Sequence, residues 1–401
     1  MKAAGLAGFR ILDLTWHVAG PYCTKLLAGF GAEVIKVERP GVGDPARGFV
    51  LASDQPVEAE KSSLFLHLNT GKKSITLDLK KTEGRRLLLQ LVRLSDAVIE
   101  SFSPRVMPGL GLGYETLRSL HPSLVMTSLS SFGQTGPYRD YRATDMVCLA
   151  MGGLLYLVGE PDREPLRPWG PQASYQAGLH AAVATLTALY QREETGVGEH
   201  VDVAVMESVA FQMHAYPQMY LHHGKIVRRE GQLIAGHGPT GHYPDTTLPC
   251  QDGFVHVGSS AYHWEDVSVL MEEPRLADPR LKAAQRAHAA EIDTLMQPWL
   301  SSHDKIEIFH RAQALRMPFA PVLTVGEVLQ DEQLCQRGYF EEVSHPVAGL
   351  VRQPGPPARL SESPWTTNAA PLLGEHNEEI YGGLLGYDAE ELAGLLDGGV
   401  I

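Results

Sequence analysis

Ser174 is the residue whose position in this chain most suggests chemistry. It follows a Pro/Gly-rich loop at 168–171 and directly precedes a predicted helix over 175–192. Backbone N–H groups at the start of a helix stabilise negative charge. We therefore expect the reaction site to lie at this loop, with Ser174 in it.

The sequence around Ser174 does not favour a serine hydrolase. A hydroxyl is a weak nucleophile unless a nearby base activates it. His180 is six residues further on, which places it on another side of the helix. No Gly-x-Ser-x-Gly elbow surrounds Ser174. A different chemistry must be sought for this position.

The helix after Ser174 is expected to be a slim, buried central element. Leu179, Val183, Leu186 and Tyr190 recur at three- and four-residue steps, so they share one face. The remaining positions are rich in alanine, and Gly178 allows another backbone to approach closely. This pattern predicts a helix packed against the middle of the fold.

The rest of the first half alternates strands with helices. Strands are predicted at 9–14, 33–38, 74–79, 96–99, 124–129 and 201–205, with helices near 20–30 and 82–94. A strand, a helix and a strand within about thirty residues form a βαβ unit, which implies a parallel sheet. The fold class is therefore α/β. No Gly-x-Gly-x-x-Gly lies between a strand and a helix, so a nicotinamide cofactor is not favoured.

Composition limits the classes of function. The chain has 401 residues, 44% apolar and 20% charged, which fits a globular protein of two domains. Its net charge of −13 argues against a nucleic-acid partner. No apolar run approaches the ~18–20 residues of a membrane span and no signal peptide is evident, so no membrane association is expected. Four widely spaced cysteines predict reduced thiols and a cytoplasmic location. The scattered histidines match no metal-ligand spacing, so no metal site is predicted.

Several short motifs spread from Phe9 to His376 resemble those of one enzyme family. They are Ala-Gly-Pro at 19–21, Gly-Ala-Glu-Val-Ile-Lys-Val-Glu-Arg-Pro at 31–40, Asn-Thr-Gly-Lys-Lys-Ser at 69–74, Gly-Gln-Thr-Gly-Pro at 133–137 and Ala-Pro-Leu-Leu-Gly-Glu-His at 370–376. On these motifs the chain resembles the family III CoA-transferases (the CaiB/BaiF family), a group that includes formyl-CoA transferases, carnitine CoA-transferases and alpha-methylacyl-CoA racemases. The resemblance implies a Rossmann-like large domain with a parallel sheet, a smaller α+β domain, and an interlocked dimer of ring-like chains.

The resemblance also suggests domain boundaries. Residues 1–208 would form the N-terminal part of a large CoA-binding domain. A linker at 209–235, where the composition shifts after Ser208, would lead to a small domain at 236–325. Residues 326–401 would then return to pack on the large domain.

The chain departs from this family at the position of the catalytic nucleophile. The family's loop ordinarily reads Asp-Tyr-x-x-Gly, and its Asp attacks the acyl-CoA thioester to give a reactive mixed anhydride. This chain has Ser174 in place of that Asp, and a serine would give a much less activated oxyester. The racemases carry a catalytic His where this chain has Thr144. Racemase activity is therefore not expected, because both proton carriers are missing.

The resemblance implies a set of contacts to CoA, which would be a substrate and not a permanently bound cofactor. These contacts fall at Val18, Arg39, Lys72, Lys73, Ser101 and Arg105. A guanidinium matches phosphate geometry, and the two lysines could neutralise phosphate charge. At Ser101 the family usually has Asn, and Arg105 stands two places beyond a usual basic position. Each residue also fits a plainer interpretation as loop or solvated surface.

Three functions remain open at this point, so whether the chain alone is an enzyme is not decided. It could transfer CoA between an acyl-CoA and a carboxylic acid, with the nucleophile replaced or supplied elsewhere. It could be a non-catalytic subunit that needs an Asp-bearing partner, as in the benzylsuccinate CoA-transferases. It could also bind CoA thioesters for altered chemistry. The partners would be an acyl-CoA, a carboxylic acid, and a second identical or paralogous subunit.

Overall fold

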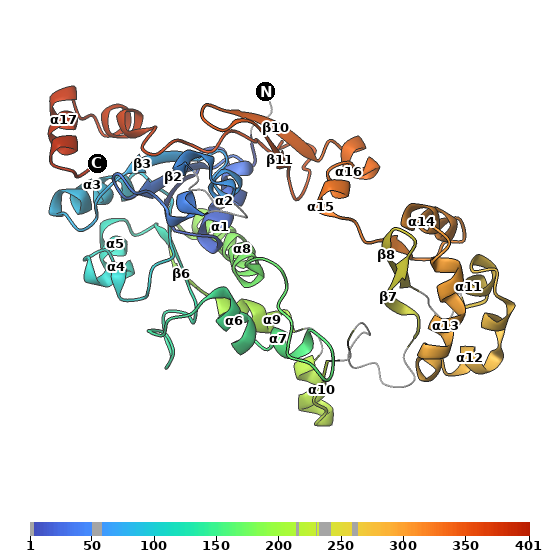
Figure 1. Cartoon of the computed structure of the whole chain (residues 1–401). Coiled ribbons are helices and arrows are strands. Elements are labelled where there is room, and N and C mark those ends of the chain that lie inside the picture. The colour runs from blue at the N-terminus through green and yellow to red at the C-terminus, as the bar shows by residue number, and fades with distance from the viewer. Residues whose placement is uncertain (1–3, 50–57, 214–215, 230, 232–241, 259–263) are drawn as a thin grey trace. The chain divides into compact units, whose positions relative to one another are not determined.

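The computed structural model describes residues 4–49, 58–213, 216–229, 231, 242–258 and 264–401 (Figure 1). The chain folds as two units, and each is built from more than one segment. The first unit comprises residues 1–152, 169–212 and 335–401, and the second comprises residues 153–168 and 213–334. Residues 153–168, predicted to lie in the large domain, belong to the second unit. The predicted linker at 209–235 lies partly outside the described residues.

A six-stranded parallel sheet forms the centre of the first unit. Its order is β3-β2-β1-β4-β5-β6, and every neighbouring pair is parallel. The strands are β1 Arg10–Leu14, β2 Glu33–Glu38, β3 Lys73–Thr76, β4 Ala97–Glu100, β5 Val125–Ser130 and β6 His200–Ala204. This confirms the predicted α/β fold, and each strand lies within three residues of its predicted limits. The order reverses direction between β1 and β4, and ligands of such sheets bind outside the carboxyl ends of the strands at this point.

Helices cover both faces of this sheet. Helices α3 and α5 share one hydrophobic core with Leu12, Val98 and Met126 of the strands. On the other face, Thr24 of α1 donates a hydrogen bond to Asp13, and the hydroxyls of Thr127 and Thr185 lie 2.7 Å apart between β5 and α8. The helices of the first unit are α1 Ala19–Gly29, α2 Ser63–Leu68, α3 Thr82–Val92, α4 Val106–Gly109, α5 Tyr114–Leu120, α6 Asp145–Met151, α8 Gln172–Thr195 and α9 Val205–Phe211.

Helix α8 is central, as predicted, but it is not buried on all sides. Its small residues are buried, whereas Leu179, Val183 and Tyr190 are 47%, 57% and 72% exposed. The reason is its close approach to α1: a Cβ added to Gly178 would lie 2.4 Å from the carbonyl oxygen of Ala19. Only small side chains fit at such a contact, so the larger apolar side chains lie on the outer face of α8.

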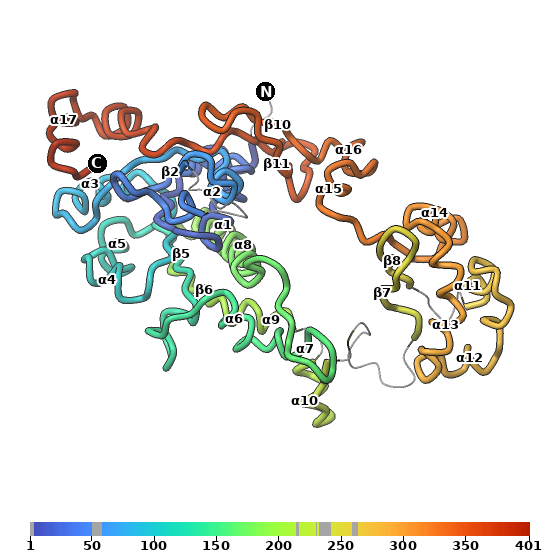
Figure 2. The backbone as a smooth tube through the Cα atoms, in the orientation of Figure 1, coloured from blue at the N-terminus to red at the C-terminus, as the bar shows by residue number. Residues whose placement is uncertain are grey.

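The C-terminal segment returns to the first unit, as Figure 2 shows by the red tube beside α3. It contains the hairpin β10 Phe340–His345 and β11 Gly349–Pro354, a π-helix at Glu378–Leu384 and α17 Ala389–Asp397. Asp78 N–H donates to the carbonyl of Val400 (2.8 Å), and the Tyr381 hydroxyl donates to the carbonyl of Thr76 (2.8 Å). Leu395 also joins the hydrophobic core on the α3 side of the sheet.

The second unit contains a core of its own. The hairpin of β7 Asp245–Cys250 and β8 Gly253–Gly258 pairs with the short strand β9 Ala320–Pro321. Trp264, Ile292 and Phe319 are buried in this core. The helices of the second unit are α7 Leu154–Leu157, α10 Tyr216–His223, α11 Trp264–Leu270, α12 Pro279–Ala283, α13 Ala289–Leu300, α14 Lys305–Ala314 and α15 Val325–Val328, and α16 Glu332–Gln336 spans the boundary to the first unit.

Candidate active site

The loops that follow β1 and β4 meet at the point where the strand order reverses. The backbone N–H of Trp16 donates to the hydroxyl of Ser101 (3.0 Å), and the Trp16 and Phe102 rings lie edge to face with centroids 5.2 Å apart. The guanidinium of Arg39, at the end of β2, lies 4.6 Å above the Trp16 ring. Three sequence-distant segments thus form one surface at the carboxyl ends of the strands. Ser101 and Arg39, two of the predicted site residues, belong to it.

The loop after β1 is held in an unusual conformation. His17 has a positive φ of 65°, which is uncommon for a residue other than glycine, and its N–H donates to the Asp44 carboxylate (3.1 Å). Val18 follows as the residue that precedes α1, and it is buried at 8% exposure. The predicted contact at Val18 would therefore come from its backbone. Sequence analysis missed His17, because no pattern of residue types indicates a positive φ there.

Lys72 lies inside the protein and not at the crevice surface. Its ammonium bonds to the Asp13 carboxylate (3.0 Å), the Asn69 side-chain oxygen (2.8 Å) and the Pro21 carbonyl (3.0 Å), and its side chain has no exposed surface. The structure therefore leaves no free bond on Lys72 for a CoA phosphate, contrary to the expectation. Burial of Asp13 by itself raises its pKa, but Lys72 and Lys36 outweigh burial and hold that pKa well below its usual range.

Lys73 and Arg105 lie at the surface and are paired with acids. Lys73 bonds to Glu33 (2.6 Å) and Glu379 (2.7 Å). Arg105 is 74% exposed and pairs with Asp140 (2.5 Å). The hydrogen bonds that both side chains donate therefore go to acidic side chains and not to the loop that contains Trp16. Of the cations predicted to bind CoA, Arg39 is the one that the structure places at the crevice.

Ser174 lies in the first turn of α8. The helix begins at Gln172, three residues before the predicted start at Tyr175. Both its backbone N–H and its hydroxyl donate to Oδ1 of Asp145, each at 2.8 Å. Asp145 is the first residue of α6, 29 positions earlier in the sequence. Both residues are half-buried. A carboxylate is therefore in direct contact with the position where the chain has serine.

Helix packing brings Ser174 toward the crevice loop. Gly178, one turn after Ser174, contacts the backbone of Ala19, which is the first residue of α1. The Tyr175 ring lies edge to face with the Tyr22 ring, with centroids 4.9 Å apart. The start of α8 and the start of α1 are thus neighbours. The glycine in the sequence indicated a close contact, but not its partner.

A second buried carboxylate lies at the end of β4. Glu100 is 3% exposed and accepts a hydrogen bond from Phe102 N–H (2.8 Å). Burial raises the pKa of Glu100 to about 7; hydrogen bonds from Ser128 and Phe102 lower it, and the charge of Asp202 raises it. No described cation pairs with Glu100. Glu100 was not singled out from the sequence, because the burial of a carboxylate without a paired cation is visible only in three dimensions.

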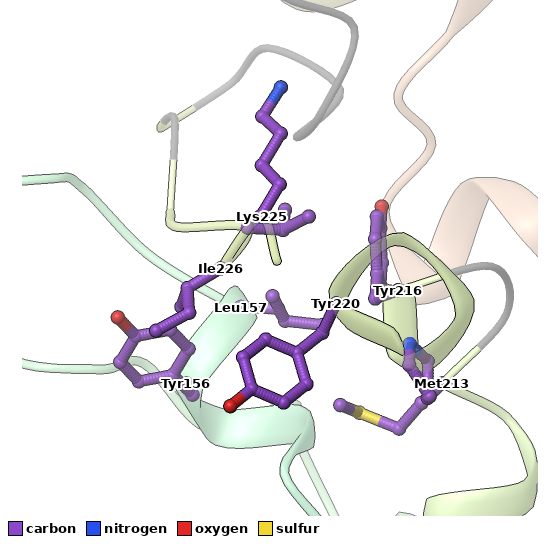
Figure 3. Close-up of a pocket in the computed structure, with 9 residues that line it drawn as sticks. Tyr156, Leu157, Met213, Tyr216, Tyr220, Lys225 and Ile226 are labelled. Carbon is purple, nitrogen blue, oxygen red and sulfur yellow. The ribbon is translucent and has the colours of Figure 1, made fainter. Parts of the chain in front are cut away.

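Two hollows are lined by other residues. One, about 620 Å³ of partly open space, is lined by Lys73, Asn368, Glu375 and His376 beside the start of β3. The other lies in the second unit, and Figure 3 shows Tyr156, Leu157 and Tyr220 around it, with Lys225 extending away. Its lining is mainly aromatic and aliphatic. The described residues bring no three metal-ligating side chains together, and none of the described helices is both long and apolar enough to cross a bilayer.

Comparisons with known proteins agree with this architecture. The model of CoA-transferase family III matches residues 6–377. A formyl-CoA:oxalate CoA-transferase of Streptomyces coelicolor is 34% identical over 100% of both chains, and one of Bradyrhizobium sp. is 34% identical over 99% of this chain and 97% of its own.

Solved structures give the same result. A CAIB/BAIF family protein from Brucella suis superposes with a TM-score of 0.85 at 30% identity, covering 96% of this chain and 100% of that one. Rv3272 from M. tuberculosis superposes with a TM-score of 0.80 at 29% identity, covering 94% of this chain and 99% of that one. The matches extend over nearly the whole chain and both units. This chain belongs to CoA-transferase family III.

Proposed function

We propose that this chain itself transfers CoA from an acyl-CoA thioester to a carboxylic acid. The observation that carries the proposal is the surface that the loops after β1, β2 and β4 form at the carboxyl ends of these strands. There, Arg39 stacks on Trp16 and is exposed, so its guanidinium is available to a phosphate or an adenine. The backbone of Val18 and the Ser101 hydroxyl lie beside it.

The substrates that we propose to test first are formyl-CoA and oxalate. Relatives 34% identical over the full length are formyl-CoA:oxalate CoA-transferases. At this identity the acyl pocket can differ, and one methylene changes binding by only about 1–3 kcal/mol. The proposal is therefore for a small carboxylic acid, with oxalate as the reference member.

The exposed face of α8 supports a dimer. Leu179, Val183 and Tyr190 form an apolar stripe on it, and Phe211 of α9 is 83% exposed beside His180. Exposed apolar patches of this kind commonly mark protein interfaces. We propose that a second subunit covers this face, and light scattering on the purified chain would measure the assembly. The cysteines among the described residues are free, and we place the protein in the cytoplasm.

The test is CoA exchange by the purified full chain, measured by mass spectrometry. Formyl-CoA is mixed with oxalate, then with a panel of other small acids, and the new acyl-CoA is quantified. Calorimetric titration with CoA measures binding separately. Exchange by the chain alone is the expected result, and it would exclude the non-catalytic subunit.

Two other outcomes favour the alternatives. The chain alone could show no exchange and still bind CoA tightly. If an Asp-bearing partner then restores exchange, this chain is a supporting subunit. CoA-thioester binding with no exchange under either condition would indicate altered chemistry. If the chain neither exchanges nor binds CoA, the proposal is wrong.

A further inference from the structure

CoA transfer needs an atom that can carry an acyl group in an activated form. A carboxylate does this, because its attack on a thioester gives a mixed anhydride that a thiolate can reopen. A serine ester is much less activated, so Ser174 would trap the acyl group instead of passing it on. The chemistry therefore requires a carboxylate within reach of Ser174.

Asp145 is such a carboxylate. Its Oδ1 accepts both hydrogen bonds from Ser174, at 2.8 Å each, whereas its Oδ2 has no hydrogen-bond partner among the described residues. The carboxylate lies against the N-terminus of the 24-residue helix α8, where backbone N–H groups stabilise negative charge. One oxygen is thus fixed in place while the other is left open.

Other carboxylates near the crevice are not available in this way. Asp13 and Asp44 have no exposed surface, and each pairs with a buried lysine. Glu100 is 3% exposed, and a backbone N–H engages its Oε2. Asp202 accepts the backbone N–H of Gln134 with both oxygens. Asp145 combines partial exposure with an open oxygen.

We propose that Asp145 is the nucleophile of the transfer and that Ser174 positions it; this inference rests on the proposed function. Oδ2 of Asp145 attacks the thioester carbonyl, the C–S bond breaks, and CoA leaves as thiolate. The thiolate then attacks the aspartyl carbonyl of the anhydride, which gives an Asp145–CoA thioester and releases the donor acid.

The acceptor acid completes the cycle in two further steps. Its carboxylate attacks the Asp145–CoA thioester, which gives a second mixed anhydride and frees the thiolate again. The thiolate attacks the acceptor's carbonyl, which forms the product thioester and restores the Asp145 carboxylate. Each bond broken is matched by a bond formed, and no proton, oxidant or metal is consumed.

The first experiment compares Asp145→Asn with Ser174→Ala in CoA exchange. Asparagine still accepts the two hydrogen bonds from Ser174, so the variant should fold with an unchanged melting temperature and bind CoA as before. Its exchange rate should fall on the order of 10³-fold or more. Ser174→Ala removes one hydrogen bond to the nucleophile, and its rate should fall by about tenfold.

The second experiment locates the carboxylate. With ¹⁸O-labelled acceptor acid, each cycle passes an acceptor oxygen through the anhydride, so the label enters the enzyme carboxylate. Trypsin separates residues 143–163, which contain Asp145, from residues 164–192, which contain Ser174. Fragmentation should place the label on Asp145 in the first peptide. Label on any other residue, or full activity of Asp145→Asn, would overturn the inference.

A variant that restores the family's usual carboxylate separates failure of this inference from failure of the proposed function. In the double variant Asp145→Asn/Ser174→Asp, a carboxylate stands on α8 instead of α6. The natural chain could show no exchange while the double variant or Ser174→Asp exchanges CoA. In that case the CoA site is functional, and Asp145 is not the nucleophile. If the natural chain and both variants show no exchange and do not bind CoA, both the proposed function and this inference are wrong.

Discussion

Two buried carboxylates at the same edge of the sheet behave in opposite ways. Asp13 is near the end of β1 and Glu100 is the last residue of the neighbouring strand β4. Burial raises the pKa of both. Asp13 contacts Lys72 and lies near Lys36, and its pKa is held well below its usual range. Among the residues that the structure describes, no cation is paired with Glu100, and its pKa rises to about 7.

The difference shows how the sheet edge is divided. On the β1–β2 side, charges are paired into a buried network that includes Lys36 with Asp44 (2.8 Å) and Arg47 with Glu38 (2.8 Å). On the β4–β6 side, Glu100 lies near Asp202 and has no compensating charge. On the first side, buried acids and bases neutralise one another. The second side holds a carboxyl that titrates near neutral pH.

The largest effect is expected from removing one charge of the buried ion pairs on the β1–β2 side. Lys72→Met leaves Asp13 buried without its closest cation, which should lower the free energy of unfolding by about 3–5 kcal/mol. Lys73→Met is the matched control, since its two partners are at the surface and its loss should cost about 0–1 kcal/mol. Urea unfolding of both variants measures the difference. Equal losses would contradict the assignment of Lys72 to structure.

The next effect concerns the unpaired carboxyl. Folded Glu100, with its pKa of about 7, keeps its proton almost to neutral pH, whereas an unfolded glutamate loses its proton near the ordinary pKa of 4.5. Between these values the folded state binds more protons, so stability should fall as pH rises, by roughly 3 kcal/mol in total. Glu100→Gln should remove most of this slope. Unfolding curves from pH 4.5 to 8 test this, and an unchanged slope in the variant would assign the dependence to another group.

A change at the crevice should affect binding and leave stability intact. Arg39→Ala removes an exposed cation stacked on Trp16, so CoA affinity should fall about 10- to 100-fold, as expected for a charged hydrogen bond to phosphate. Arg39→Lys keeps the positive charge but loses the planar stacking on Trp16, so it should retain only part of the CoA affinity. Calorimetric titration with CoA gives both values. Unchanged affinity in Arg39→Ala would move the phosphate site elsewhere.

The smallest effect is expected at Arg105. Its pair with Asp140 is exposed, so Arg105→Ala should change the free energy of unfolding by about 0–1 kcal/mol. CoA affinity should stay within about twofold of the natural chain, because the side chain already has a carboxylate partner. A tenfold loss of affinity would show that Arg105 leaves Asp140 to bind CoA. The same titration serves for Arg39 and Arg105.

The sequence predicted the scaffold better than the site. Strand positions followed from apolar runs and turns, and the family motifs implied the α/β fold that the structure confirms. The sequence left open which face of α8 is inside, because periodicity says which residues share a face and not which of the faces is buried. Leu179 and Val183 share a face, as predicted, but Gly178 and the alanines form the contact with α1.

The site escaped prediction for a different reason. Lys72 and Lys73 are adjacent and chemically equivalent in the sequence, yet one is buried and the other is at the surface. Asp145 and Ser174 are 29 residues apart, and their contact depends on the way α6 packs on α8. Long-range contacts of this kind leave no local pattern in residue types.

The return of residues 335–401 to the first unit has a consequence for synthesis on the ribosome. The N-terminal strands emerge first, but the N–H of Asp78 gains its hydrogen-bond partner only when Val400 is made, and the hydrophobic core that contains Leu87 is completed only by Leu395 and other C-terminal residues. Residues 243–319, by contrast, contain a complete core of their own. Contacts between such distant positions form slowly. During translation, the segment made in the middle can therefore fold before the segment made first, whose hydrophobic core on the α3 side of the sheet stays incomplete until the C-terminal residues have emerged.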